Sequence, residues 1–308
     1  MAESAGAPAS ALAWAWSGTI GPVTTDRIDD DTTWIPRMDR PQVLPTAIAA
    51  GAAAILTGIL LAGAQFGSVL FAGTVLLVQL LLIAAWFLGV RTPGRIGVGA
   101  VAVGAALAGD GAAAFARDAT VAPLAGVVAV AFGATVVAQL VRGGARRHVT
   151  EAFGATMTLV VGVVALASTV SLHRQSGGPG LLVTCLVAAG VGLVVARVTD
   201  LVVPGPNVHY AVPRGLVGIG VGSVVGALAA IVAALLNDSI SVPLAAIAGW
   251  GVALAGILAD LAVGYASAGR ALVGDEPEAS PLRPLLGPLL GLAVAAPAGY
   301  VFGLVLLS

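Results

Sequence analysis

Nine long apolar runs make up most of the chain from Val43 onward, and short polar breaks separate them. Each run holds about 20 residues or more, enough for an α-helix to cross roughly 30 Å of hydrocarbon at about 1.5 Å per residue. The breaks carry the Gly and Pro residues that are typical of turns. The predicted spans are 43–64, 66–90, 96–115, 119–141, 150–172, 179–203, 214–236, 241–262 and 284–307.

Charged residues are too few for a water-soluble fold. Only 29 of the 308 residues are charged, and residues 1–42 hold nine of them, so the other 266 residues carry just 20 charges. A soluble surface uses roughly a quarter to a third charged residues. We therefore predict an all-α polytopic membrane bundle and exclude a soluble enzyme and a nucleic-acid binder. Because Cys185 is the only cysteine, a disulfide-stabilised secreted domain is excluded as well.

The arginines indicate the orientation, since Lys and Arg are enriched in cytoplasmic loops. With the N-terminus in the cytoplasm, twelve of the 14 basic residues fall on that side, and only Arg117 and Arg174 fall on the other. We expect a multi-pass protein of the cell membrane with its amino end inside and its carboxyl end outside. Residues 1–42, which include an acidic cluster at 26–31, are expected to form a disordered cytoplasmic tail, and residues 43–308 the transmembrane domain.

Ionisable residues inside the apolar runs are the informative ones, because a buried acid there costs about 2.5–3.5 kcal/mol on insertion scales. Asp110 falls near the outer end of the third run, close to Arg117, and is expected to be an interfacial acid. Asp200 follows Arg197 by three positions, so the two share a helix face and are expected to pair. Asp260 has no base within four positions in sequence and is the least explained charge in the chain.

These acids predict a polar cleft that opens to the cytoplasm between the sixth, seventh and eighth helices. Its candidate residues are Asp200, Asp260, Arg197, Arg214 and His209. The three histidines have no metal-ligand spacing to one another, and no serine–histidine–acid set stands out. No catalytic residue and no metal ligand is therefore assigned from the residues alone.

Small residues recur at helical spacing in the seventh run, at Gly218, Gly222 and Gly226. Such positions let helix backbones approach closely in lipid, where no hydrophobic force drives helices together. They predict helix packing rather than a nucleotide-binding loop, because no strand precedes them as that motif requires.

The second half of the chain carries several motifs in a definite order. Residues 149–154 and 176–180 begin and follow the fifth run, and residues 196–200 end the sixth run with an acid. A proline and a base at 213–214 then precede the glycine-rich run. The motif Leu258-Ala-Asp260 and the closing residues 297–300, which read Pro-Ala-Gly-Tyr, come last.

In this order the motifs resemble those of the CDP-diacylglycerol synthases (phosphatidate cytidylyltransferases), polytopic enzymes that join phosphatidate to CTP. Asp260 is similar to the acid of the family's Gly-Asp-Leu motif, and Tyr300 to the tyrosine of its closing Pro-x-x-Tyr pattern. The resemblance covers about half of the chain. It implies a membrane fold with a lipid-facing cleft.

The chain departs from the family where the catalytic groups belong. The glutamate-serine and lysine-arginine pairs that follow Gly-Asp-Leu in the family are replaced here by Val263, Gly264, Ser267 and Ala268. Nucleotidyl transfer needs Mg²⁺ held by carboxylates and basic groups directed at the developing charge. We therefore expect no cofactor, with Mg²⁺ bound only if the chain is catalytically active.

The leading hypothesis is a noncatalytic relative of the synthases that binds a lipid head group, or a partner membrane protein, through the cleft. Arg214, Arg270 and Arg283 on the cytoplasmic face would attract a phosphate-bearing lipid. The alternatives are an active cytidylyltransferase with a metal site rebuilt from the acids of residues 275–278, and a transporter or channel component. A nucleic-acid partner is not expected.

Overall fold

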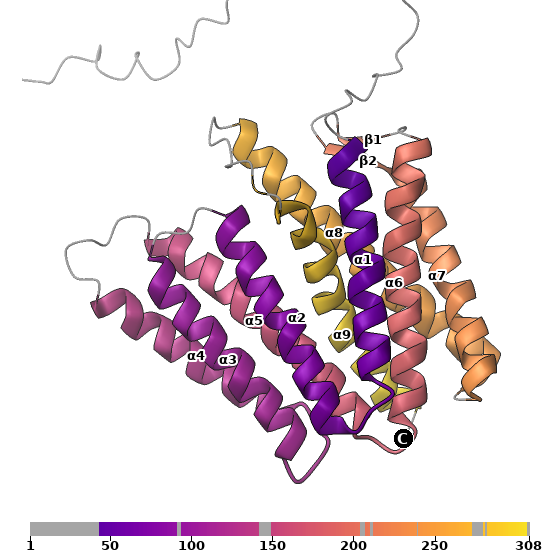
Figure 1. Ribbon diagram of the computed structural model, residues 1–308, viewed down its shortest axis with the longest axis horizontal. Coiled ribbons are helices and arrows are strands. Elements are labelled where there is room, and N and C mark those ends of the chain that lie inside the picture. The colour runs from indigo at the N-terminus through magenta and orange to yellow at the C-terminus, as the bar shows by residue number, and fades with distance from the viewer. Residues whose placement is uncertain are drawn as a thin grey trace, which may run out of the picture. The chain divides into compact units, whose positions relative to one another are not determined.

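The computed structural model describes residues 43–90, 94–141, 149–203, 207–209, 212–238, 240–272, 280 and 282–306. Within these ranges, nine helices are long and apolar enough to cross a membrane, so the predicted helical membrane bundle is confirmed (Figure 1). The expected tail at residues 1–42 lies outside the described residues. The helices are α1 (Val43–Gly63), α2 (Ser68–Gly89), α3 (Arg95–Phe115), α4 (Ala122–Val141), α5 (Val149–His173), α6 (Gly178–Val202), α7 (Leu216–Asn237), α8 (Val242–Leu272) and α9 (Leu286–Leu306).

The end of α8 differs most from its prediction. The eighth span was predicted to stop at residue 262, where the hydrophobic run weakens, but the helix continues to Leu272. Its 31 residues would extend about 46 Å, well beyond the roughly 30 Å of a hydrocarbon core. The added turns are rich in alanine, which favours helix, so the helix continues although these turns include polar residues such as Arg270.

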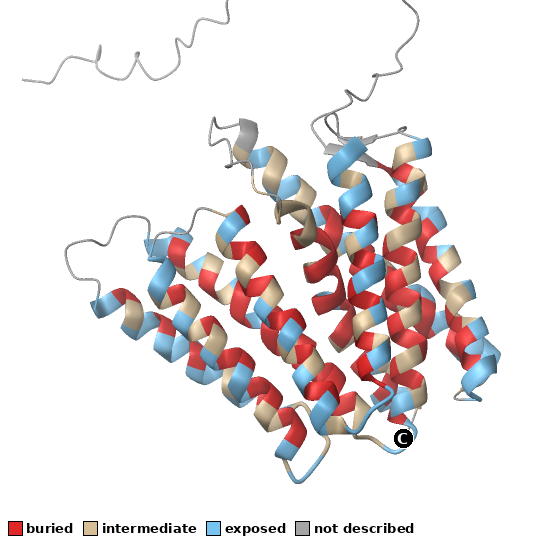
Figure 2. Cartoon of the chain, viewed as in Figure 1, coloured by how far each residue is buried: buried red, intermediate tan, exposed pale blue. Residues whose placement is uncertain are grey.

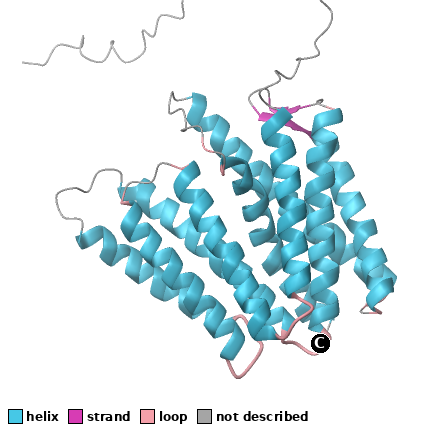
Figure 3. Ribbon diagram, in the orientation of Figure 1, coloured by secondary structure: helices cyan, strands magenta, loops and turns pink. Residues whose placement is uncertain are grey.

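A short antiparallel hairpin interrupts the helices between α6 and α7. Strand β1 (Asn207–His209) pairs with β2 (Val212–Gly215) (Figure 3). A one-turn 3₁₀ helix, η4 (Arg283–Leu285), precedes α9. The hairpin lies on the side of the bundle where α1 begins, and α9 ends on the opposite side (Figure 1). Two ends on opposite sides are what an odd number of spans requires.

The centre of the bundle is formed by α5 and α6. About 72% of the most apolar window of α5 and 61% of that of α6 are buried, against 22% for α4 (Figure 2). The outer helices expose large apolar side chains such as Val130, Val141 and Leu236. A soluble protein would hide such side chains from water, whereas in a bilayer they face lipid.

Glycine contacts join α6, α7 and α8, as the spacing in the seventh run predicted. A methyl group added at Gly222 would lie 2.7 Å from the carbonyl oxygen of Gly192 on α6. One added at Gly226 would lie 2.5 Å from Cβ of Ala253 on α8 and 2.9 Å from the carbonyl oxygen of Ala188 on α6. No real Cβ atom approaches that closely, so the backbones meet at these positions only because the residues are glycine.

Candidate functional site

A buried ion pair connects α6 to α8. Arg197 donates a hydrogen bond from Nε to Oδ2 of Asp260 over 2.8 Å, and a second guanidinium nitrogen donates to Oδ1 of the same carboxylate. Asp260 is fully buried, and the side chain of Arg197 is 15% exposed. The acid that had no base nearby in sequence therefore receives one from a helix 63 positions earlier.

The expected pairing of Arg197 with Asp200 is wrong. Although the two residues lie one turn apart on α6, the guanidinium of Arg197 points to α8 and is taken by Asp260. Without Arg197, the carboxylate of Asp260 would be a buried charge without this counter-charge, which is costly, whereas Asp200 has another donor. Pairing of Arg197 with Asp260 therefore stabilises the fold more than pairing with Asp200 would.

Asp200 instead accepts a hydrogen bond at the start of α7. Its Oδ1 lies 3.0 Å from the backbone nitrogen of Gly215, the residue that precedes the helix, and Asp200 is only 2% exposed. The first backbone N–H groups of a helix have no partners within it and form a partially positive end. Asp200 satisfies one of these groups from a different helix, so its carboxylate holds α7 against α6.

Glycines on α7 and α9 make room for the two acids. A methyl group at Gly218 would collide with Oδ1 of Asp200 and would lie 2.9 Å from the carbonyl oxygen of Ala196. One at Gly287 would collide with Oδ1 of Asp260 and lie 2.7 Å from a guanidinium nitrogen of Arg197. Each carboxylate is thus packed directly against the backbone of a neighbouring helix.

The structure brings three of the five predicted cleft residues, Asp200, Asp260 and Arg197, to one region of the bundle. The backbones of His209 and Arg214 belong to the nearby hairpin, but their side chains lie outside the described part of the chain, as do residues 275–278. Four cavities lined by described residues have volumes from about 10 to about 680 Å³, and none of these four is lined by Asp200 or Asp260. An open cleft at the acids stays a prediction.

The donor set around Asp260 does not fit a Mg²⁺ ion. Both carboxylate oxygens accept hydrogen bonds from Arg197, and Mg²⁺ needs carboxylate oxygens that are open to the ion. The described residues contain no group of three or more His, Cys, Asp or Glu side chains that could hold a metal ion.

Two further arginines lie together where α8 ends and η4 begins. Arg283 is partly buried, and Arg270 lies near enough for its positive charge to act on Arg283 as well. Nε of Arg270 donates to the carbonyl oxygen of Ala266 in its own helix, over 3.3 Å. Among the described residues, neither arginine pairs with a carboxylate. The result is a small positive patch, which we call the Arg270–Arg283 pair.

The interpretation of Asp110 as an interfacial acid is wrong. Asp110 is 6% exposed, and its Oδ1 accepts a hydrogen bond over 2.9 Å from Nε2 of Gln79, which is fully buried on α2. Sequence reasoning missed Gln79, although an amide in the middle of an apolar run is a visible signal. The hydrophobic run indicates only how far along the helix Asp110 lies. The packing of α2 against α3 determines that its side chain points into the bundle.

Arg174, one of the two arginines expected outside, closes the end of α3. It donates from Nη1 to the carbonyl oxygen of Ala113 over 2.8 Å and from Nη2 to that of Ala116 over 2.7 Å. The last carbonyl groups of a helix lack partners and form its partially negative end, so a guanidinium there stabilises α3.

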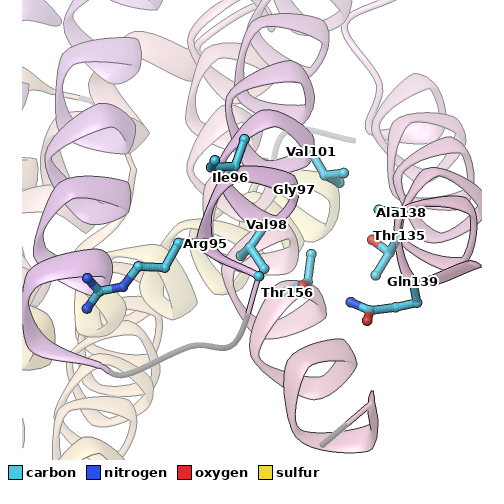
Figure 4. A pocket seen from close by; sticks show the side chains of 10 residues that line it. Arg95, Ile96, Gly97, Val98, Val101, Thr135, Ala138, Gln139 and Thr156 are labelled. Atoms are coloured by element: carbon cyan, nitrogen blue, oxygen red, sulfur yellow. The ribbon is translucent and has the colours of Figure 1, made fainter. Parts of the chain in front are cut away.

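A separate cavity of about 500 Å³ lies between α3, α4 and α5. Thr135, Gln139 and Thr156 supply its polar lining, whereas the guanidinium of Arg95 extends away from these three side chains (Figure 4). The hydroxyls of both threonines donate to carbonyl oxygens of their own helices. This cavity contains none of the predicted cleft residues.

Comparison with known proteins adds no relative: no family model, no curated protein and no solved structure matches this chain. What the structure shows is a multi-pass helical membrane protein with a buried Arg197–Asp260 pair.

Proposed function

We propose that this protein is a noncatalytic multi-pass protein of the cell membrane that binds the phosphate-bearing head group of an anionic lipid at the Arg270–Arg283 pair. The observation that carries the proposal is the placement of two partly buried arginines at the end of α8 and in η4, where neither pairs with a carboxylate of the described residues. An anionic phosphate would supply both with a counter-charge, and arginine is the side chain best suited to bind phosphate oxygens.

The state of the two membrane-depth acids supports a noncatalytic role. Asp260 is held by Arg197, and Asp200 is held by the backbone N–H of Gly215, just before α7. A nucleotidyltransferase would present such carboxylates to Mg²⁺ rather than to an arginine and a helix end. On this proposal, the resemblance to the CDP-diacylglycerol synthases reflects a similar lipid-facing architecture and not a shared catalytic activity.

The position of the pair also suits a lipid ligand. In the predicted topology, the end of α8 and the start of α9 face the cytoplasm, where anionic lipids give the leaflet a negative surface potential. Each arginine near such a surface contributes about 1 kcal/mol, so the two together account for roughly a 30-fold difference in affinity.

Lipid titration by native mass spectrometry of the detergent-solubilised protein tests the proposal. We expect phosphatidate adducts at lipid concentrations where phosphatidylcholine gives none, and about 30-fold weaker phosphatidate binding in Arg270→Gln/Arg283→Gln. Arg95→Gln is the matched control, because Arg95 is an exposed arginine on the same predicted side but on α3. Unchanged phosphatidate binding in the double variant, or equal binding of phosphatidylcholine, would refute the proposal.

The same protein incubated with labelled CTP and phosphatidate separates this proposal from the catalytic alternative. We expect no transfer of label to lipid with or without Mg²⁺. Transfer that Asp260→Asn abolishes would place an active cytidylyltransferase here instead.

A further inference from the structure

A second polar site lies in the other half of the bundle, between α2, α3 and α5. Gln79 is at the middle of α2, eleven positions after the first residue and ten before the last. Its Nε2 donates two hydrogen bonds of 2.9 Å, one to Oδ1 of Asp110 on α3 and one to the carbonyl oxygen of Val163 on α5. One amide group thus joins three transmembrane helices at membrane depth.

Two oxygen atoms of this site have no hydrogen-bond donor among the described residues. Oδ2 of Asp110 and Oε1 of Gln79 are both buried and unpartnered, although their residues are 6% and 0% exposed. The amide nitrogen of Gln79 cannot supply either atom, because both of its N–H groups are already used. A buried acceptor without a donor is rare in folded proteins and needs an explanation.

No charged group of the described residues neutralises Asp110. Within the described part of the chain, its carboxylate accepts a hydrogen bond only from the neutral Gln79, and α1, α2 and α4 contain no ionisable residue. Arg174 at the end of α5 is the cation that packs against α3, and its guanidinium is taken by two carbonyl oxygens of that helix. The remaining titratable groups on the elements around the site are Arg95, Arg117, Asp118, Glu151, His173, Arg283 and Tyr300.

Among the described residues, none of these groups forms a hydrogen bond or an ion pair with the carboxylate of Asp110, and the hydroxyl of Tyr300 donates to the carbonyl oxygen of Ala119. Arg117 and Asp118 are exposed beyond the end of α3, and His173 bonds to the carbonyl oxygen of Ala64. Arg95 and Glu151 belong to the first turns of α3 and α5, at the far end of the helix from Asp110. The carboxylate of Asp110 is only 6% exposed and has no counter-charge among the described residues, and an ionised acid in such a setting is costly.

We propose that Asp110 and Gln79 form a binding site for one positive charge at membrane depth, carried by a proton or by a small alkali cation such as Na⁺. A proton taken from hydronium forms an O–H bond at Oδ2 of Asp110 and leaves water behind, and the neutral carboxyl then has a hydrogen to donate. A sodium ion is held instead by the oxygen atoms Oδ2 and Oε1, which match its preference for oxygen ligands. Release reverses either step and restores the carboxylate.

The site is independent of the proposed lipid site. It involves α2, α3 and α5, whereas the arginine pair belongs to α8 and η4. Intramembrane carboxyl groups that load and release a cation are typical of proton relays and ion pathways. Cation binding at Asp110 and Gln79 is therefore a property that binding of a lipid head group neither requires nor explains.

Heat denaturation of the full-length protein in detergent, followed by tryptophan fluorescence, tests the proposal. The thermal midpoint is measured in sodium-free buffer at about pH 6 and at about pH 9. We expect it to fall between these two pH values in the wild type, and this fall should exceed the fall in Asp110→Asn by at least about 2 °C. The sign follows from the site, because the folded state holds the neutral carboxyl best and loses this stabilisation as rising pH removes the proton. Asp118→Asn, which removes an exposed acid just beyond α3, should respond as the wild type does.

Sodium distinguishes the two carriers. If Na⁺ restores the wild-type midpoint at high pH and choline does not, the site accepts an alkali cation; if Na⁺ has no effect, it accepts a proton only. Infrared spectroscopy gives a second reading, since a protonated Asp110 contributes a carboxylic acid band that Asp110→Asn lacks. The proposal is overturned if Asp110→Asn matches the wild type in its pH response, its sodium response and its carboxylic acid band.

Discussion

Replacing Arg197 with Met should destabilise the bundle strongly, because it removes the cation from a carboxylate that has no access to water. Asp260 is 0% exposed and receives two hydrogen bonds from the guanidinium of Arg197. Methionine keeps most of the aliphatic stem of the arginine, so packing changes little while the charge disappears. The carboxylate then stays buried without its counter-charge.

The expected magnitude is about 3–5 kcal/mol, the usual cost of removing one partner from a buried ion pair. For a protein of this size, that corresponds to a fall in the thermal midpoint on the order of 10 °C. The double variant Arg197→Met/Asp260→Asn should lose less than the single variant, because asparagine fits the space beside Gly287 and carries no charge. We expect it to recover about 2 kcal/mol of the loss.

The chain carries its own reporter for this measurement. Cys185 is the only cysteine and is 4% exposed on α6, the helix that carries Arg197. A fluorogenic thiol dye added to the detergent-solubilised protein therefore reports the temperature at which the bundle opens. If the double variant proves as unstable as Arg197→Met, the loss comes from packing of the arginine stem, and our reasoning about the buried charge is refuted.

Three further results are expected. Gly218→Ala should lower the midpoint by several degrees, because its methyl group collides with the carboxylate that holds α7, whereas Gly220→Ala on the same helix meets nothing within 4 Å and should not. Arg174→Gln should cost about 1.5–3 kcal/mol, the worth of hydrogen bonds to a charged group, and should lower the thiol-dye midpoint accordingly. In a Cys185→Ser background, a cysteine placed at Asp238 should react with a membrane-impermeant maleimide added outside intact cells, as the predicted topology requires.

The controls for these results use exposed positions. Arg117→Gln is the control for Arg174→Gln, because it removes an exposed arginine near the same end of α3. It should leave the midpoint within about 1 °C of the wild type. Asp118→Cys should be labelled from outside together with Asp238→Cys, since an even number of spans separates them. Labelling of only one of the two would contradict the alternation of helices, and labelling of neither would reverse the orientation.

Much of the fold was predictable because the bilayer makes simple local demands. A helix that crosses hydrocarbon needs about 20 apolar residues in a row, and this requirement is written in each segment separately. The nine spans were therefore found to within a few residues, except at the end of α8. At that end, the hydrophobic residues become sparse after residue 262, but the helical hydrogen bonding of α8 continues to Leu272 because nothing in the sequence interrupts it. The glycine face of α7 was also visible, because close helix packing requires small residues at a regular spacing.

The polar contacts were not predictable in the same way. The spacing along α6 predicted that Arg197 pairs with Asp200. In the structure, α6 is rotated so that Arg197 faces α8 and pairs with Asp260 instead. The sequence placed Asp110 near the outer end of its span, but only the packing of α2 against α3 shows that its side chain is buried against Gln79.

By itself, then, the sequence determined that this is a membrane protein and which of the described segments can cross a bilayer, since those properties depend on the transfer of each segment out of water. Tertiary structure alone decided which buried charges are paired and which acceptors are left bare. Those contacts join residues tens of positions apart, and they depend on how whole helices are rotated and packed rather than on any local pattern.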